Sequence, residues 1–175
     1  AALQDRDRDR DSVVDAFYDT DLEITWLRNA DQNGAMDWDT AVAWVDGFSF
    51  AGYDDWRLPN ADPGCGSAYN CTGSEMGHLW YVELGNPAGG PMTNTGSFQN
   101  LYADAYWSGT EYTPSFLAWY FVTTEGAQYA GEKSNPFYAM PVRAGDVPVV
   151  PEPGTYALML AGLGALALTW RRRSN

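Results

Sequence analysis

Acidic side chains recur at every second position near the start of the chain, from Asp5 to Asp11, with arginines between them, and Asp15 follows after an apolar pair. Alternating oxygen ligands of this kind are typical of calcium-binding loops, where carboxylates and one backbone carbonyl surround the ion. The candidate ligands are the carboxylates of Asp7, Asp9, Asp11 and Asp15 and the carbonyl of Val13. Ser12 stands where such loops carry a glycine, and Tyr18 where they carry a bidentate glutamate. The stretch predicts either a Ca²⁺ site or a solvated, self-neutralising arm.

Aromatic side chains in the last third of the chain are a second group that could bind a ligand, because flat aromatic faces pack well against sugar rings. The candidates are Tyr112, Phe116 and Tyr129, which lie in or beside the loops expected there. We expect these three residues to contact a ligand at the surface.

The sequence contains no arrangement typical of catalysis. His78 is the single histidine, and no serine, cysteine or second histidine is patterned beside it. We interpret it as a surface or half-buried helix residue rather than as a base or a metal ligand. The many carboxylates show no spacing that singles out an acid and a base, and no phosphate-binding loop is present. The prediction is a protein that is not an enzyme.

Composition predicts one globular domain with short extensions. The chain has 175 residues, of which 45% are hydrophobic and 15% aromatic, which favours a compact, loop-rich fold. The formal net charge of -13 makes nucleic acid a poor partner. We divide the chain into an Asp-rich arm at 1–16, a globular domain at 17–146, a Pro-rich linker at 147–154 and an apolar segment with an arginine cluster at 155–175.

Hydrophobic periodicity places the elements of the domain. Alternating apolar residues predict extended segments over 17–27, and Asp37 is placed to cap a helix that ends at Gly47. The spacing from Thr72 to Glu75 is that of a capping box and predicts a second helix ending at Gly85. Aromatic and β-branched residues predict strands at 105–108, 118–122 and 138–143, with a turn at 125–126 and Pro141 at an edge or a bulge.

The stretch Trp56-Arg57-Leu58-Pro59 predicts a rigid corner. In an extended segment Trp56 and Leu58 point to one side and are buried, while Arg57 points elsewhere. Pro59 ends strand pairing. Arg57 is one of few cations in an acidic chain, so we expect it to bind carbonyl oxygens or a carboxylate through several hydrogen bonds.

These residues also resemble a known family. The Trp-Arg-Leu-Pro signature, with Trp38, the Ser74-Glu75-Met76 and Tyr106-Trp107-Ser108-Gly109 segments and Val142-Arg143, is similar to the C-terminal domain of the collagen-like adhesin Lcl. The resemblance runs from about Tyr18 to Arg143 and implies an α+β, C-type-lectin-like fold. In such a fold two helices pack on a twisted, mainly antiparallel sheet, here followed by a C-terminal apolar helix.

The end of the chain resembles a PEP-CTERM sorting signal. Pro151-Glu152-Pro153 is followed by an uncharged apolar stretch and then by Arg171-Arg172-Arg173. The resemblance implies recognition and cleavage by an exosortase and transfer to the cell surface or the exopolysaccharide layer. The apolar stretch and its arginines predict transient membrane anchoring. Because the sequence begins at Ala1 and not at a methionine, we expect a signal peptide to have been removed or omitted.

Export also guides the interpretation of the cysteines. Cys65 and Cys71 lie close together in a Gly/Asn/Ser-rich loop, and with His78 they are too few for a zinc site of soft ligands. The alternative is that both cysteines are free thiols in a cytosolic protein, but the sorting tail indicates an exported one. We therefore expect a local disulfide between them.

Three functions are weighed against one another. The first is a non-enzymatic, lectin-like module at the cell surface or in the extracellular matrix, which binds glycan, exopolysaccharide or another envelope component. The calcium-dependent Glu-Pro-Asn motif of C-type lectins is absent, so the fold does not by itself imply sugar binding. The second is a structural protein of a biofilm matrix or filament that self-associates, with calcium ordering the arm. The third is a relative of the formylglycine-generating oxidases, which need a reactive cysteine.

Overall fold

A computed structural model describes residues 3–8 and 11–148 of the chain. Its strands form two antiparallel sheets, where the sequence suggested one. In the order β1-β2-β3-β8, the first sheet contains β1 (Leu3–Arg6), β2 (Ala16–Asp19), β3 (Ile24–Leu27) and β8 (Val142–Ala144). In the order β4-β7-β6-β5, the second contains β4 (Ala68–Tyr69), β5 (Ala105–Glu111), β6 (Leu117–Val122) and β7 (Ala127–Glu132).

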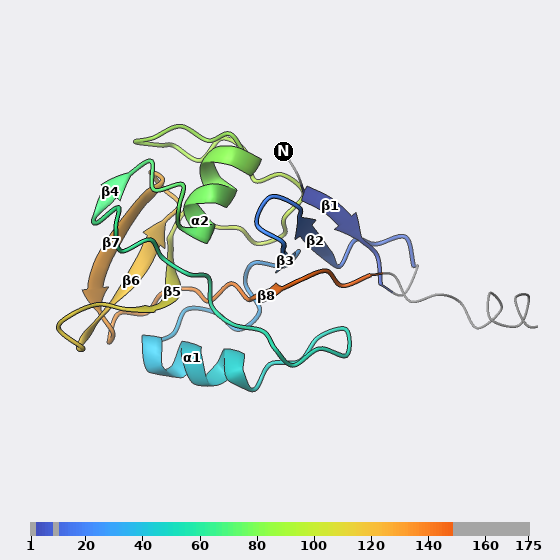
Figure 1. Cartoon of the computed structure of the whole chain (residues 1–175), viewed down its shortest axis with the longest axis horizontal. Coiled ribbons are helices and arrows are strands. Elements are labelled where there is room, and N and C mark those ends of the chain that lie inside the picture. Colours follow the sequence, from blue (N-terminus) through green and yellow to red (C-terminus); the bar gives the residue numbers. More distant parts are fainter. Residues whose placement is uncertain (1–2, 9–10, 149–175) are drawn as a thin grey trace, which may run out of the picture.

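Two short helices lie on opposite sides of the strands (Figure 1). They are α1 (Trp38–Asp46) and α2 (Glu75–His78), and α2 continues into a π-helical turn, η1 (Leu79–Glu83). The mixed α and β composition that we predicted is therefore confirmed, with strands in the majority. Within the described residues, neither helix has the length and apolar character needed to cross a lipid bilayer. The predicted C-terminal helix at 155–175 lies outside these residues.

Side-chain caps explain where both helices begin. The Asp37 carboxylate accepts a hydrogen bond from the Thr40 amide at 2.9 Å, and Gly47 follows the last residue of α1, as predicted. At α2 the cap is Ser74, whose hydroxyl accepts from the Gly77 amide at 3.0 Å, and not Thr72 as the capping-box spacing suggested. The capping box does not form, because Glu75 is the first and not the third residue of the helix, and its carboxylate accepts from Arg57 instead.

Two apolar clusters fill the space between these elements. One joins the first sheet to α2 and η1 and contains Trp26 and Trp80, while the other lies under α1 and contains Trp56 and Trp107. All four tryptophans are buried. Complete burial of such a ring contributes roughly 4–6 kcal/mol of hydrophobic free energy before entropy is counted. Because the helices and strands are short, large aromatic rings supply much of the buried apolar area of this domain.

The Trp56–Pro59 corner is built as predicted. Trp56 and Leu58 are buried, and the Arg57 backbone pairs with Val142 through two hydrogen bonds of 2.8 Å. The Arg57 guanidinium donates to both carboxylate oxygens of Glu75, each at 2.7 Å, and to the Leu58 carbonyl at 3.1 Å. The corner therefore links β8 to the start of α2.

The last third of the chain differs from the sequence prediction in two places. The strand predicted at 138–143 is shortened to β8, which begins directly after Pro141, because proline has no amide hydrogen to donate to a ladder. A strand that the sequence pattern did not indicate, β7, lies at the centre of the second sheet between β4 and β6. Gly131 within it packs beneath the Tyr120 ring, where a side chain would collide.

Candidate functional site

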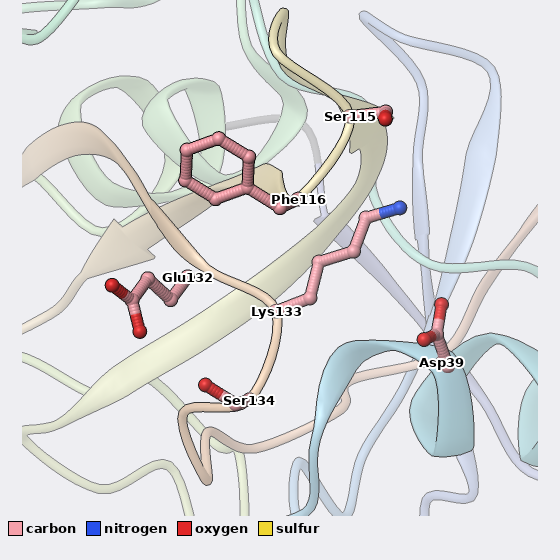
Figure 2. Close-up of a pocket in the computed structure, with 6 residues that line it drawn as sticks. All are labelled: Asp39, Ser115, Phe116, Glu132, Lys133 and Ser134. Atoms are coloured by element: carbon pink, nitrogen blue, oxygen red, sulfur yellow. The ribbon is translucent and has the colours of Figure 1, made fainter.

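An exposed aromatic hollow lies where β6 and β7 meet the start of α1. Phe116, just before β6, is 62% exposed, the highest value among the large hydrophobic residues of the described chain. The hollow has a volume of about 480 Å³ and is lined by Asp39, Ser115, Phe116, Glu132, Lys133 and Ser134. Figure 2 shows the one ring among these residues together with two hydroxyls, two carboxylates and one ammonium group. Such a mixture of one apolar face and several polar groups suits a polyhydroxylated ligand.

Lys133 fixes the geometry of this hollow. Its amide donates to the Phe116 carbonyl at 3.1 Å, and its carbonyl accepts from the Trp38 amide at 2.8 Å. The ammonium group lies 4.0 Å from the centre of the Trp38 ring and also pairs with Glu111. One residue therefore fastens the Phe116 loop, the end of β7 and α1 together, so the hollow is preformed.

The other two aromatic candidates lie elsewhere. Tyr112 borders a neighbouring hollow of about 320 Å³, where its ring meets that of Trp119 edge to face at 4.9 Å. Tyr129 lines neither hollow, and its hydroxyl donates to Glu125 at 2.9 Å. That hydrogen bond and burial raise the pKa of the Tyr129 hydroxyl. The structure thus brings Tyr112 and Phe116 onto one loop and separates Tyr129 from them.

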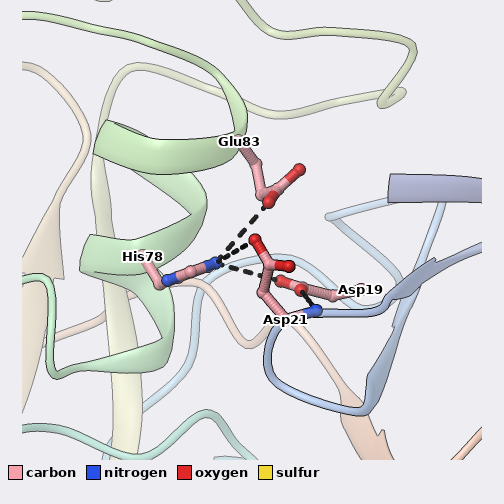
Figure 3. Close-up of side chains that lie close together, drawn as sticks. All are labelled: Asp19, Asp21, His78 and Glu83. Atoms are coloured by element: carbon pink, nitrogen blue, oxygen red, sulfur yellow. Dashed lines mark hydrogen bonds and ion pairs between the residues drawn. The ribbon is translucent and has the colours of Figure 1, made fainter. Parts of the chain in front are cut away.

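A histidine and three carboxylates meet at a second position, which the sequence analysis missed. The Nε2 atom of His78, at the end of α2, lies 3.7 Å from an oxygen of Asp19 and 3.5 Å from one of Glu83. Asp21 contributes a third carboxylate oxygen, 4.0 Å from the same nitrogen. Figure 3 shows these groups pointing toward one another from the end of β2, from the β2–β3 turn and from the helix. Because the four ligand atoms all lie within 4.8 Å of one another, they could hold a metal ion.

Local backbone structure explains why this cluster was not visible in the sequence. Residues five apart on an α-helix of 3.6 residues per turn point about 140° away from each other. His78 and Glu83 have this separation, but the chain between them is π-helical, with the Leu84 amide bonded to the Leu79 carbonyl at 2.9 Å. Hydrogen bonding from i to i+5 places both side chains on the same face. A π turn could not be predicted from apolar periodicity.

The predicted calcium arm is only partly described. Asp9 lies outside the described residues, and Val13 is exposed. The remaining carboxylates accept backbone hydrogen bonds within the same loop: Asp7 from Ser12 at 3.0 Å, Asp11 from Val13 at 2.7 Å and Asp15 from Arg8 at 2.7 Å. These contacts organise the loop, and calcium binding there stays a prediction.

The two cysteines form the expected local disulfide. Cys65 and Cys71 are bonded, with 5.7 Å between their Cα atoms. The bond closes the polar loop that precedes α2, next to the Ser74 cap. The sorting residues Pro151, Glu152, Pro153, Arg171, Arg172 and Arg173 lie outside the described residues.

Comparisons with known proteins agree with both resemblances. The model of the Lcl C-terminal domain matches residues 15–143, and that of the PEP-CTERM protein-sorting motif matches residues 149–173. A comparison with curated proteins gave no match. The sorting motif marks the chain for export, exosortase processing and sorting to the cell surface. Since the first match spans most of the chain, the protein belongs to the Lcl C-terminal domain family.

Proposed function

We propose that this domain is a non-enzymatic binding module of the cell surface or extracellular matrix, and that the hollow around Phe116 binds carbohydrate such as exopolysaccharide or another envelope glycan. The exposed Phe116 ring in a preformed polar hollow is the observation that carries the proposal. The family resemblance to C-type-lectin-like folds and the sorting motif support a module displayed outside the cell.

The chemistry of the hollow suits a neutral or cationic sugar. The apolar face of a pyranose ring packs on an aromatic ring, while its hydroxyls donate to carboxylates. Asp39 and Glu132 are exposed and supply such acceptors, and Ser115 and Ser134 add hydroxyls. Anionic sugars are disfavoured, because the two carboxylates and the overall charge of -13 repel them.

A glycan array probed with the full chain tests this proposal. We expect binding to neutral or amino-sugar glycans that falls at least tenfold in Phe116→Ala, because the stacking surface is lost. Tyr102→Ala is the matched control, since Tyr102 is 41% exposed and does not line the hollow. Absence of any hit, with and without Ca²⁺, would refute the proposal.

The disulfide favours a binding role over an oxidase role. A formylglycine-generating type of chemistry requires a reactive thiol, and both cysteines of the chain are bonded to each other. This distant alternative would regain weight if reduction of the disulfide produced oxidase turnover.

Self-association is a second candidate function. β1 is an edge strand of the first sheet, with Gln4 and Asp5 exposed, so its outer backbone groups could pair with another chain. Ca²⁺ at the Asp-rich arm would order the same region. Analytical ultracentrifugation across millimolar Ca²⁺ tests the idea, and a chain that stays monomeric throughout would exclude it.

We also propose that the sorting tail anchors the chain only transiently. Exosortase would recognise Pro151-Glu152-Pro153 and release the domain from the apolar segment held by Arg171, Arg172 and Arg173. Glu152→Ala should then leave unprocessed, membrane-associated protein, as seen by mass spectrometry of cell fractions. Normal processing of that variant would contradict the proposal.

A further inference from the structure

The cluster of Asp19, Asp21, His78 and Glu83 contains a buried carboxylate oxygen with no hydrogen-bond donor. Asp19 is completely buried. Its Oδ1 atom accepts from the amides of Asp21 and Leu22, at 3.0 and 3.1 Å. Its Oδ2 atom and the His78 Nε2 atom are both buried and have no hydrogen-bond partner. A buried polar group in this state is costly and requires a physical explanation.

The turn between β2 and β3 determines where Asp19 points. The two amide hydrogen bonds to Oδ1 hold the carboxylate in one orientation, and this orientation directs Oδ2 toward His78 (Figure 3). Burial raises the pKa of Asp19, and the amides of Leu22 and Asp21 partly offset that effect. The β2–β3 turn thus fixes the Asp19 carboxylate at a buried position, where burial disfavours its charged form.

The spacing of the four groups suits a metal ion better than direct hydrogen bonds. The Nε2 atom lies 3.5 to 4.0 Å from the three carboxylate oxygens, which exceeds hydrogen-bonding distance. Metal bonds of about 2.0–2.2 Å in tetrahedral geometry separate neighbouring ligand atoms by about 3.3–3.6 Å. The three distances from Nε2 are within about half an ångström of this spacing, and all four ligand atoms lie within 4.8 Å of one another, so closure on an ion requires side-chain movements of about an ångström or less. Asp21, whose side chain is 50% exposed, is free to make the largest movement.

We propose that Asp19, Asp21, His78 and Glu83 bind one divalent first-row transition-metal ion, such as Zn²⁺ or Mn²⁺. Imidazole nitrogen selects this class over Mg²⁺ and Ca²⁺, which prefer all-oxygen sites. Four protein ligands make a closed, structural site rather than a catalytic one with an open position. The proposal is independent of the Phe116 hollow and of the predicted Ca²⁺ ligands in the arm.

Such an ion would fasten the start of the domain to its helix. Asp19 is the last residue of β2 and Asp21 lies in the β2–β3 turn, while His78 and Glu83 belong to α2 and η1. The second oxygen of Glu83 accepts a hydrogen bond from the Leu3 amide at 3.1 Å, which extends the connection to β1. The metal should therefore stabilise the first sheet against unfolding.

Isothermal titration of the chelator-treated full chain with Zn²⁺, Mn²⁺ and Ca²⁺ tests the proposal. We expect one Zn²⁺ or Mn²⁺ per chain, and an unfolding temperature about 5–10 °C higher at hundredfold excess over Kd. Asp19→Asn, which keeps the Oδ1 acceptor, should weaken Zn²⁺ binding at least hundredfold. The exposed Asp54→Asn is the matched control and should bind as the unmodified chain does. Equal Zn²⁺ affinity in Asp19→Asn and in the unmodified chain would overturn the proposal.

NMR of the imidazole provides a readout that needs no variant. His78 is the single histidine of the chain, so its ring signals are identified without mutation. Zn²⁺ should shift the Nε2 resonance at one equivalent, in slow exchange. An imidazole spectrum that does not change at saturating Zn²⁺ would also overturn the proposal, whatever ion binds elsewhere.

Discussion

The two ends of α2 present carboxylates in opposite states. At the first residue, Glu75 has both oxygens occupied, since Arg57 donates to each and the Asn60 amide donates to one at 2.7 Å. At the last residue, His78 faces an Asp19 oxygen that no donor reaches. The difference teaches that buried charge in this domain serves two purposes. A fully hydrogen-bonded carboxylate is part of the scaffold, and one left without a donor marks a site for a cation.

The largest expected effect on stability comes from removing the hydrogen bonds between Arg57 and Glu75 at the start of α2. Arg57→Met would leave the Glu75 carboxylate without its guanidinium in a site that is 13% exposed. Because Arg57 itself is 35% exposed, we expect the free energy of unfolding to fall by about 2–3 kcal/mol, less than for a fully buried pair. Urea denaturation measures this loss.

A double variant separates the cost of losing the Arg57–Glu75 ion pair from the cost of leaving the Glu75 carboxylate unpaired. Arg57→Met combined with Glu75→Leu should cost less than Arg57→Met alone, because no buried carboxylate remains unpaired. If the double variant is less stable than Arg57→Met alone, the loss of stability comes from the missing ion pair and not from an unpaired Glu75 carboxylate.

Gly77 lies within α2, between Glu75 and His78, so a substitution there should affect both the stability of the domain and Zn²⁺ binding. A Cβ atom there would come within 1.9 Å of the Cys71 carbonyl, so α2 would have to move away from the disulfide loop. We expect Gly77→Ala to cost about 1–3 kcal/mol of stability and to weaken Zn²⁺ binding as well. Calorimetry of unfolding and of Zn²⁺ binding measures both. Gly34→Ala, where a Cβ meets nothing but φ is +73°, controls for general glycine effects.

The hydrogen bonding of Arg57 at the start of α2 could be predicted from the sequence, whereas the Asp19–His78 cluster at the end of α2 could not. Alternation of Trp56 and Leu58 around Arg57, and the scarcity of cations in an acidic chain, were enough to infer a multiply bonded guanidinium. Its partner Glu75 was interpreted as part of a capping box. His78 and Asp19 are far apart in the chain, and their meeting depends on a π turn and on the β2–β3 turn. Neither turn leaves a periodic signal, so local pattern could not reveal the cluster.

The same contrast appears in the second sheet. Caps at Asp37 and Gly47 and the aromatic strands near 105 and 118 were predictable from local chemistry. β7 was not, since Gly131 and the polar residues around it weaken the strand pattern and only the neighbouring strands make it extended. Phe116 was correctly chosen as exposed, whereas the partners of the Tyr129 hydroxyl depend on tertiary packing.

The smallest expected effect concerns the ion pair between Arg143, which is buried, and Asp55, whose side chain is 53% exposed to solvent. Arg143 donates to both oxygens of Asp55, and these bonds hold the pKa of Asp55 below its usual range. The stabilisation is therefore complete above the ordinary carboxyl value of about 3.9 and is lost as the pH falls through the lower folded value. Thermal unfolding should show the unmodified chain slightly more stable than Asp55→Asn near neutral pH. The two curves should converge at strongly acidic pH, and a gap that widens there would contradict this assignment.

The most direct test compares thermal unfolding of the unmodified chain, Arg57→Met and Asp19→Asn, each with excess Zn²⁺ and with chelator. We expect Arg57→Met to be less stable in both conditions and to keep the full Zn²⁺-dependent rise. Asp19→Asn should lose that rise yet be at least as stable as the unmodified chain in chelator, because its buried charge is gone. A Zn²⁺-dependent rise that survives in Asp19→Asn, or a large destabilisation of that variant in chelator, would contradict the account.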